Sequence, residues 1–331
     1  MRGAAGRHAA TRVRAAVVLT WVFQLSTLHF AEFFRHPQAA RLVPVRRLIF
    51  NADDFGLTAG VNRSVVEAHT QGVLTSATLM ANAPATADAE SRVRSYPKLE
   101  VGCHVVLLDG EPLTDPARLS SLVPNGAPKF RTGLGDFAVR ALSGLLDHDQ
   151  IESEATAQFR KLQSAGLSLT HFDTHKHAHM FPYVLDPLLR AARICGIPAV
   201  RNPFEPAQSF SAILAQSPVR WKRSGQTRAL RLLQPGFSEL VKRSGLRTTD
   251  GTLGIAATGS LTAALLAGIL ENVPEGTWEF VCHPGYCDDD LRSAHTRLQE
   301  SRQVELQLLT APQTRELLKK SGIDLISYAE L

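Results

Sequence analysis

The order of the predicted secondary structure constrains the fold of this 331-residue chain more than any other feature. From Arg47 onward, short runs of β-branched and aromatic residues alternate with longer amphipathic runs. Strands that alternate with helices in this way form parallel βαβ units. We count about seven such units and predict a (β/α) barrel-like α/β fold, imperfect or seven-stranded, with parallel strands inside and helices outside. A doubly wound open sheet is the second choice.

The predicted strands are RRLIFNA, SATLMAN, LEVGCHVVL, LSLTHFD, IPAVRNP, TWEFVCHPG and IDLISYAEL. For the helix that follows the first strand, Thr58 is the predicted N-cap and Gly72 the glycine at its end. The final helical segment is expected to break near Pro312. We treat residues 47–331 as one domain, in which the segment 204–252 fits neither pattern and is predicted to be an irregular excursion.

Basic charge is concentrated in the first 47 residues, which hold eight arginines and one acid. The other 284 residues hold 28 basic and 30 acidic side chains, so we expect no nucleic-acid partner. Residues 1–46 are predicted to be a basic, apolar leader outside the fold. Three interpretations of it stay open: a non-structural leader or misplaced start, a membrane-surface helix, and a signal or anchor segment. Its apolar run is interrupted before it reaches the length of a spanning helix.

The four cysteines form no CxxC pair and are too few for a disulfide framework in a chain of this length. They are Cys103, Cys195, Cys282 and Cys287. We therefore expect a reducing, cytoplasmic location, with membrane association if the leader binds a membrane surface. Cys103 and Cys282 each precede a histidine. Because neighbours in a strand face opposite sides, we expect these two thiols to be small buried groups rather than zinc ligands.

Acidic and histidine side chains follow four of the predicted strands. They are Asp53 and Asp54, then His104, then Asp173 with His175, and finally His283. The C-terminal ends of parallel strands meet at one rim, where binding and catalytic sites of such folds lie. We therefore expect these side chains to meet in space.

Each of these residues has a structural as well as a functional interpretation. One of Asp53 and Asp54 can bind a metal ion while the other takes a proton from water, or both can complement the N-terminus of the next helix. His104 is either a ligand or a hydrogen-bonded core residue. His283, held in a tight turn by the proline and glycine that follow it, is either a general acid or a core residue.

The segment FDTHKHAHMF carries Asp173, His175, His177 and His179 at alternate positions. An extended chain sends alternate side chains to one face, so the segment is either part of a metal site or a merely polar loop, and a ligand set needs partners from elsewhere in the chain. Asp173 is suited to orient a ligand histidine through a hydrogen bond. We expect His177 and His179 either to support the ligands in this way or to contact the substrate.

One carboxylate and two histidines leave positions on a cation open for water and substrate. With a carboxylate base and a second acid–base residue, they supply the parts needed to hydrolyse an amide or ester. One alternative is a metal-dependent phosphoesterase, for which Arg201 and Arg131 are the candidate phosphate ligands. The other is a non-catalytic sugar- or lipid-binding protein on the same scaffold.

Four blocks of the sequence resemble the YdjC-like carbohydrate deacetylases, which include the chitooligosaccharide deacetylases. The blocks are LIFNADDFGLTAGVNRSVVEAHTQGVLTSATLM, VGCHVVL, THFDTHKHAHMFP and CHPGY. The longer stretches VLLDGEPL and CHPGYCDDDLRSAHTRLQESRQVELQLLT resemble the hopanoid-biosynthesis-associated branch. The leader departs from the family pattern, in which the first of these strands usually opens the protein.

The resemblance implies a barrel-like α/β fold and one divalent cation, Mg²⁺ or Zn²⁺. By motif, the ligands would be Asp54, His104 and His175, with Asp53 as general base and His283 as the acid that protonates the leaving amine. The implied reaction removes acetyl from an N-acetylated amino sugar, and in the narrower branch from an N-acetylglucosaminyl hopanoid lipid. The expected partners are this sugar or glycolipid substrate, a peripheral membrane contact and a second copy in a homodimer.

Overall fold

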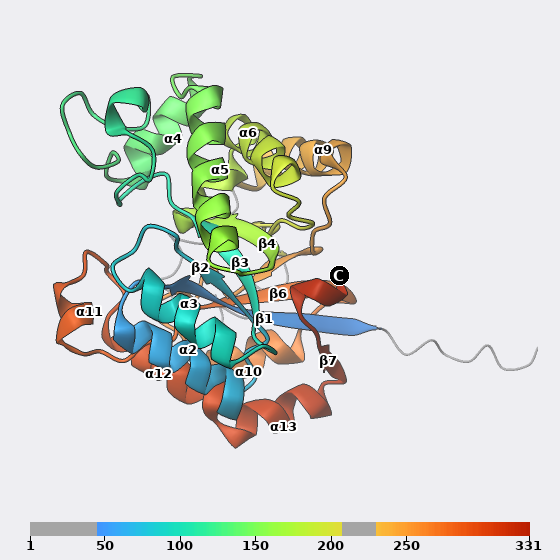
Figure 1. Cartoon of the computed structure of the whole chain (residues 1–331). Coiled ribbons are helices and arrows are strands. Elements are labelled where there is room, and N and C mark those ends of the chain that lie inside the picture. The colour runs from blue at the N-terminus through green and yellow to red at the C-terminus, as the bar shows by residue number, and fades with distance from the viewer. Residues whose placement is uncertain (1–44, 207–229) are drawn as a thin grey trace, which may run out of the picture. The chain divides into compact units, whose positions relative to one another are not determined.

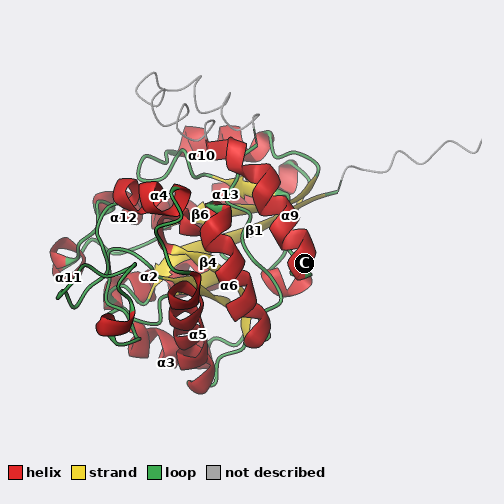
Figure 2. Cartoon of the chain, turned by 90° about the horizontal axis from the view of Figure 1, so that it is seen from above, coloured by secondary structure: helices red, strands yellow, loops and turns green. Residues whose placement is uncertain are grey.

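A sheet of parallel strands lies at the centre of the protein, with helices around it (Figures 1 and 2). The computed structural model describes residues 45–206 and 230–331. Within these ranges the sheet has seven strands in the order β4-β3-β2-β1-β6-β5, with β7 also paired to β1, and every pair is parallel. The strands are β1 Arg46–Phe55, β2 Ser76–Leu79, β3 Glu100–Val105, β4 Leu169–Thr174, β5 Gly251–Leu253, β6 Gly276–Cys282 and β7 Ile323–Leu325.

The predicted strand IPAVRNP runs between the two edges of this sheet and makes the fold barrel-like. On the β4 side, the amide of Phe172 donates to the carbonyl of Ala199 at 3.0 Å and the amide of Arg201 donates to the carbonyl of Phe172 at 3.1 Å. On the β5 side, the amide of Thr252 donates to the carbonyl of Phe204 at 3.1 Å. The segment forms isolated bridges instead of a full strand, because its prolines lack the amide hydrogens that a ladder needs.

Helices surround the sheet: in the view of Figure 1, α2, α3, α10, α12 and α13 lie below it, and α4, α5, α6 and α9 lie above it. The α-helices are α2 Ala59–Gln71, α3 Thr86–Ser95, α4 Leu134–Leu142, α5 His148–Ser164, α6 Pro182–Ile194, α9 Gln234–Ser244, α10 Ala263–Glu271, α11 Asp289–Ser293, α12 Glu300–Thr310 and α13 Pro312–Lys320. The 3-10 helices are η1 Pro116–Arg118, η2 His175–Met180, η4 Arg231–Leu233 and η5 Tyr328–Glu330. The break predicted near Pro312 is confirmed, since this proline begins α13.

Both ends of helix α2 are fixed by the residues that the sequence singles out. The Thr58 hydroxyl accepts a hydrogen bond from the amide of Val61 at 3.1 Å, so the predicted N-cap is confirmed. At the other end, a Cβ on Gly72 would lie 2.4 Å from the carbonyl oxygen of Leu309 in α12. Any side chain at this position would therefore push α2 away from α12.

Successive residues of β1 face different parts of the interior. Phe50 belongs to the large apolar core between the sheet and the helices, whereas Ile49 packs with Tyr328 in a small second cluster. Asn51 and Asp53 follow Ile49 at alternate positions and are buried polar residues. The inner face of the sheet therefore changes along β1 from apolar to polar, and the candidate site forms at its polar end.

Besides the IPAVRNP segment, the structure differs from the prediction at two further places. Strand β1 extends to Phe55, so Asp53 and Asp54 belong to the strand and not to the loop after it. In the segment 204–252, the described residues from 230 onward contain α9 and the first part of β5, where irregular structure was predicted. Helix α9 is short, and only Phe237 and Val241 on it are buried, which explains why its sequence carries a weak helical pattern.

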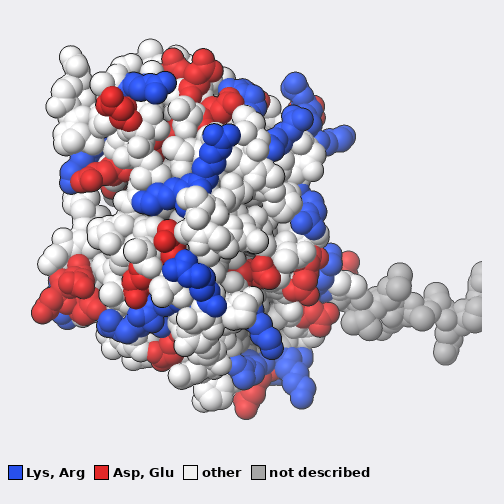
Figure 3. Space-filling view, viewed as in Figure 1, with Lys and Arg blue, Asp and Glu red and all other residues white. Residues whose placement is uncertain are grey.

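The leader predicted over residues 1–46 lies outside the described residues up to position 44, and its membrane interpretation stays a prediction. The described helices include none that is both long and apolar enough to cross a bilayer. On the face seen in Figure 3, basic and acidic side chains are interspersed and do not gather into one basic field. This distribution agrees with the near-neutral charge of the part of the chain that follows the leader.

Candidate functional site

Three of the predicted ligands form a small triangle at the C-terminal end of the sheet. Asp54 Oδ1 lies 3.4 Å from His104 Nε2 and 3.3 Å from His175 Nδ1, and these two ring nitrogens are 3.4 Å apart. Atoms that bind a tetrahedral ion at about 2.0–2.1 Å lie roughly 3.3–3.4 Å from one another. The triangle therefore fits one small divalent cation. Imidazole favours zinc and carboxylate favours magnesium, so the donor set does not decide between them.

The backbone departs from regular geometry where it presents these ligands. In a regular strand Asp53 and Asp54 would face opposite sides, but Asp54 has a φ of 62° and the pairing register of β1 shifts here. Both carboxylates consequently line one pocket. After His175, Lys176 and His177 also have positive φ values, of 55° and 54°. Such left-handed non-glycine residues are uncommon and are concentrated at functional sites.

The imidazole of His104 is held in position by Asp173, as the sequence predicts for that carboxylate. Nδ1 of His104 lies 2.7 Å from Asp173 Oδ1, which leaves Nε2 directed at Asp54 and His175. Burial opposes a charge on His104, but the carboxylate of Asp173 outweighs it and raises the pKa to about 10. Cation binding at Nε2 is therefore coupled to loss of a proton from this ring.

Asp53 is bound by Arg201 through both carboxylate oxygens. The two N–O distances are 2.6 and 2.9 Å, which is the bidentate geometry of a strong charge-assisted pair. Burial opposes ionisation of Asp53, but the charge of Arg201 more than offsets this and holds the pKa of the carboxyl well below its usual range. Asp53 is consequently ionised and fixed in orientation.

Arg201 also joins Asp53 to the rest of the site. Its side chain has no exposed surface and contacts Asp173 Oδ2 at 2.5 Å and Glu279 Oε1 at 2.6 Å. With its guanidinium shared among three carboxylates, Arg201 is not available to bind phosphate, so that prediction is wrong. Arg131, the other predicted phosphate ligand, donates to the carbonyl of Ser121 at 3.4 Å and does not line the site.

His283 lines the same pocket as the ligand triangle and lies close to Asp53. Its Nε2 is 3.9 Å from Asp53 Oδ2, and its backbone amide donates to Glu305 Oε2 at 2.6 Å. Burial lowers the pKa of His283 to about 4, although the carboxylate of Asp53 opposes the shift. The imidazole is therefore neutral near pH 7 and within reach of a group bound beside Asp53.

The remaining histidines of the FDTHKHAHMF segment divide into two kinds. His177 lines the pocket, and burial lowers its pKa to about 3. His179 does not reach the pocket: its ring nitrogens lie 2.7 Å from Thr174 Oγ1 and 3.2 Å from the carbonyl oxygen of Arg201. His179 thus ties η2 to the segment that carries Arg201.

The sequence does not single out several buried charged residues that support the site. Arg302 Nη2 lies 2.5 Å from Asp54 Oδ2, and Glu279 Oε2 accepts from the Tyr328 hydroxyl at 2.5 Å. One sequence feature could have indicated Glu279, because this acid interrupts the apolar strand TWEFVC. Arg302 and Glu305 had none, because charged residues on an amphipathic helix are ordinarily exposed.

The pocket above these residues has a volume of about 680 Å³. Its floor is formed by the two aspartates and the three histidines that carry the candidate chemistry, and its outer wall comes from the segment between α11 and α12. The lining residues are Asp53, Asp54, His104, Leu134, His175, Lys176, His177, Ile255, Thr258, His283, Ala294, His295, Thr296, Arg297 and Leu298. A volume of this size accommodates a small ligand such as one or two sugar rings.

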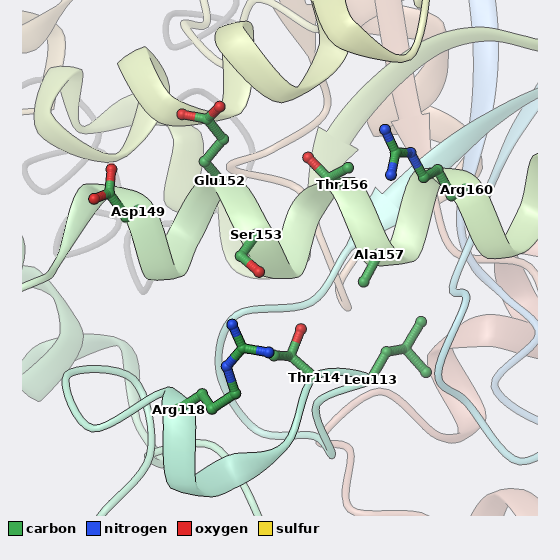
Figure 4. A pocket seen from close by; sticks show the side chains of 9 residues that line it. All are labelled: Leu113, Thr114, Arg118, Asp149, Glu152, Ser153, Thr156, Ala157 and Arg160. Carbon is green, nitrogen blue, oxygen red and sulfur yellow. The ribbon is translucent and has the colours of Figure 1, made fainter.

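A second hollow of about 570 Å³ lies between α5 and the segment 113–118 (Figure 4). It also contains charged side chains, among them Asp149, Glu152 and Arg118. In Figure 4 the two carboxylates point away from the guanidinium of Arg118. Its charged groups do not converge, so we assign the candidate chemistry to the first pocket.

A barrel-like α/β fold with a carboxylate and two imidazoles gathered at its strand ends defines a protein with a candidate metal centre. Over residues 47–320 the chain matches the model of a family described as YdjC-like protein. The chain therefore belongs to the YdjC-like family, as the four sequence blocks indicate.

Two relatives and one solved structure are similar to the chain over most of its length. The chain is 34% identical over 286 residues to a carbohydrate deacetylase of Geobacillus stearothermophilus, covering 86% of this chain and 98% of the relative. It is 31% identical over 310 residues to a human carbohydrate deacetylase, covering 87% and 92%. Among solved structures, a protein of Enterococcus faecalis V583 named for cellobiose-phosphate cleavage is 26% identical, with a TM-score of 0.69 over 86% of this chain and 98% of that one.

Proposed function

We propose that the chain is a cation-dependent carbohydrate deacetylase that hydrolyses the acetamide of an N-acetylated amino sugar to acetate and a free amine. Family membership and relatives that carry the name carbohydrate deacetylase support the class of enzyme. The observation that carries the proposal is the triangle of Asp54, His104 and His175 beside the ionised Asp53 at the floor of one pocket.

In this proposal the three residues of the triangle hold one divalent cation. A bound divalent cation polarises a carbonyl oxygen and lowers the pKa of a water molecule, toward ~7 in favourable zinc sites. This help is needed here, because the pairing with Arg201 that keeps Asp53 ionised also makes it a weak base. The remaining work falls to Asp53 and His283.

Asp53 and His283 line the same pocket close together, so both are within reach of one group bound there. Asp53 removes a proton from water, whose oxygen forms the new bond to the acetyl carbon. His283, neutral in the resting protein, receives this proton from Asp53 and donates it to the departing nitrogen as the carbon–nitrogen bond breaks. The 3.9 Å separation of Asp53 Oδ2 and His283 Nε2 supports this exchange around one bound group.

Within this class we propose a glycolipid acceptor, an N-acetylglucosaminyl hopanoid, as the natural substrate. The resemblance of the sequence around CHPGYCDDDLRSAH to the hopanoid-associated branch supports it. A basic, apolar segment at residues 1–46 would then serve as a peripheral membrane contact. Equal or faster release of acetate from soluble amino-sugar oligomers than from the glycolipid would reject the narrower proposal.

The test of the main proposal is an acetate assay on the purified full-length chain. The chain is incubated with Zn²⁺, Mg²⁺, Mn²⁺ or Co²⁺ and with acetylated amino-sugar oligomers or glycolipids, with Asp53→Asn as the inactive control. We expect cation-dependent acetate release by the unmodified chain alone. Binding of these sugars without any acetate release would instead support a binding protein, and release of phosphate from a phosphoester would support a phosphoesterase.

A further inference from the structure

Helix α12 lies behind the candidate site and carries two buried charged residues one turn apart. Arg302 has no exposed surface and Glu305 is 3% exposed. Side chains at positions i and i+3 share one face of a helix, so both point toward the site. Charged side chains are seldom fully buried unless they are paired, and the partners of these two residues indicate what they do.

Arg302 occupies the oxygen of Asp54 that faces away from the triangle. Its Nη2 lies 2.5 Å from Asp54 Oδ2, while its Nε donates to the carbonyl of Leu298 at 3.0 Å and so fixes the guanidinium. With Oδ2 engaged, only Oδ1 is directed at His104 and His175. The contact therefore restricts Asp54 to a ligand of one oxygen in a fixed orientation.

The glycine of the CHPGY motif makes room for this arginine. A Cβ on Gly285 would lie 2.8 Å from Cδ and 3.0 Å from Cβ of Arg302. The amide of Gly285 also donates to the carbonyl of Arg302 at 3.2 Å. The turn that carries His283 and the helix that carries Arg302 are thus in direct contact, and a side chain at Gly285 would separate them.

Glu305, one turn after Arg302 on α12, contacts His283 in the same turn. Its Oε2 accepts the backbone amide of His283 at 2.6 Å and lies 3.9 Å from Nδ1 of that ring. Among the described residues, Nδ1 has no hydrogen-bond partner although it is buried. Glu305 therefore fixes the backbone of His283 where the ring faces Asp53.

We infer that Arg302 and Glu305 are positioning residues, one for the proposed metal ligand Asp54 and the other for the proposed acid His283. A single turn of α12 would in this way fix the position of the metal ligand Asp54 relative to the acid His283. The inference rests on the proposed function, but its first test measures cation binding and does not need turnover.

The test of Arg302 compares the Zn²⁺ affinities of Arg302→Met, Arg302→Lys and the unmodified full-length chain by calorimetry. Loss of a group that orients a ligand costs about 10–100-fold in metal affinity or activity, and we expect this loss for Arg302→Met. Lysine keeps the charge but lacks the planar fork, so Arg302→Lys should lie between the two. Gln303→Ala, exposed on the same helix, should bind Zn²⁺ like the unmodified chain.

Whether Zn²⁺ affinity falls or rises in Arg302→Met shows whether Arg302 orients Asp54 or acts only through its positive charge. An arginine that acted only through its positive charge would repel a cation, and its removal would tighten Zn²⁺ binding. Unchanged or tighter binding in Arg302→Met would overturn the inference. If that variant does not fold, affinity of Arg302→Lys equal to that of the unmodified chain would overturn it as well.

The test of Glu305 uses turnover at saturating Zn²⁺ with an acetylated amino-sugar oligomer. Glu305→Ala removes the acceptor for the His283 amide and should lower kcat about 10–100-fold, with KM within about twofold. Glu305→Gln keeps an acceptor oxygen and should recover most of kcat, and both variants should keep full Zn²⁺ affinity. Normal kcat in Glu305→Ala, or a loss of Zn²⁺ affinity like that of Arg302→Met, would overturn the positioning role of Glu305.

Failure of the proposed function is distinguishable from failure of this inference. Absence of acetate release by the unmodified chain would reject the proposed function, whereas the Zn²⁺ titrations would still decide the role of Arg302.

Discussion

The two hollows described above are similar in size and both contain charged side chains, yet they differ in what those side chains can do. In the pocket of about 680 Å³, the carboxylates and imidazoles come from the ends of separate strands, and most are nearly fully buried. In the hollow of about 570 Å³ beside α5, Asp149, Arg118 and Arg160 are exposed. The carboxylates there point away from Arg118 (Figure 4).

The difference shows that burial and convergence decide the chemistry, while the number of charged residues does not. Two unit charges 4 Å apart interact by about 1 kcal/mol in bulk water and by about 4 kcal/mol at the effective dielectric of a protein. In the pocket these interactions lower the pKa of Asp53 and raise that of His104. Matched substitutions in the two hollows therefore test the assignment of function.

The largest effect is expected at the two aspartates Asp53 and Asp149. Asp53→Asn removes the proposed base and should lower kcat about 10²–10⁴-fold, the range for one acid–base group. Cation binding should persist, because the triangle of ligands is intact. Asp149→Asn should leave kcat unchanged, and acetate release by the two variants at saturating cation is the measurement. Near-normal turnover of Asp53→Asn would reject its role as base.

The second effect concerns the cation. Removing a ligand should cost at least as much as removing its supporting partner, so His175→Ala should weaken Zn²⁺ binding about 100-fold or more. His148→Ala, at the start of α5, should bind like the unmodified chain. Calorimetric titration of chelator-treated protein measures both affinities. Similar affinities in the two variants would place the cation elsewhere.

The residues of the site that the sequence predicts lie at strand ends, whereas the residues that it misses act through contacts distant in the sequence. The sequence predicts that Asp53, Asp54, His104 and His175 lie together because strand ends of a parallel sheet share one rim, and that rule needs only the order of the strands. The roles of Arg201 and Arg302 depend on contacts between residues 148 and 248 positions apart. No local pattern marks such contacts, and an arginine on a helix reads as an exposed side chain.

The elements of the fold that have a periodic sequence pattern were predictable, and the short elements without one were not. Alternation of strand and helix patterns gave the parallel sheet, its outer helices and the break at Pro312. The three-residue strand β5 and the helix α9 were missed, because they bury too few residues to leave a periodic pattern. The exact end of β1 was also missed, since the positive φ of Asp54 is imposed by its surroundings and not by a glycine.

The third effect compares two arginines by their contribution to stability. Arg201→Met would leave the carboxylates of Asp53, Asp173 and Glu279 buried without their shared cation, which costs about 3–5 kcal/mol of unfolding free energy. Arg160→Met, in the exposed hollow, should change it by less than about 0.5 kcal/mol. Urea unfolding of both variants provides the values. A small effect at Arg201 would mean that the buried network does not hold the site together.

The smallest expected effect compares two buried acids: Asp53, which pairs with Arg201, and Glu205, which pairs with no arginine among residues 45–206 and 230–331. Glu205 is 1% exposed and, among the described residues, accepts the amides of Gly254 and Ala256 but pairs with no arginine, so burial raises its pKa to about 7 from 4.5. Between these pH values the folded chain holds a proton that the unfolded chain releases. The contribution of the protonated Glu205 to the free energy of unfolding is therefore lost as pH rises from 4.5 to 7, by at most about 3 kcal/mol.

Glu205→Gln removes this titrating group and should make the unfolding free energy less dependent on pH across the same window. Urea unfolding at pH 5 and at pH 7 gives the two slopes to compare. An unchanged slope in Glu205→Gln would show that Glu205 is ionised throughout, like Asp53, and that burial alone does not set its charge.

The central claim is that Asp54, His104 and His175 together bind one cation beside Asp53. Anomalous diffraction from crystals grown with Zn²⁺ tests it most directly, because it locates the metal without reference to activity. We predict one strong peak within bonding distance of Asp54 Oδ1, His104 Nε2 and His175 Nδ1. Absence of a peak there, or a peak held by other residues, would contradict the claim.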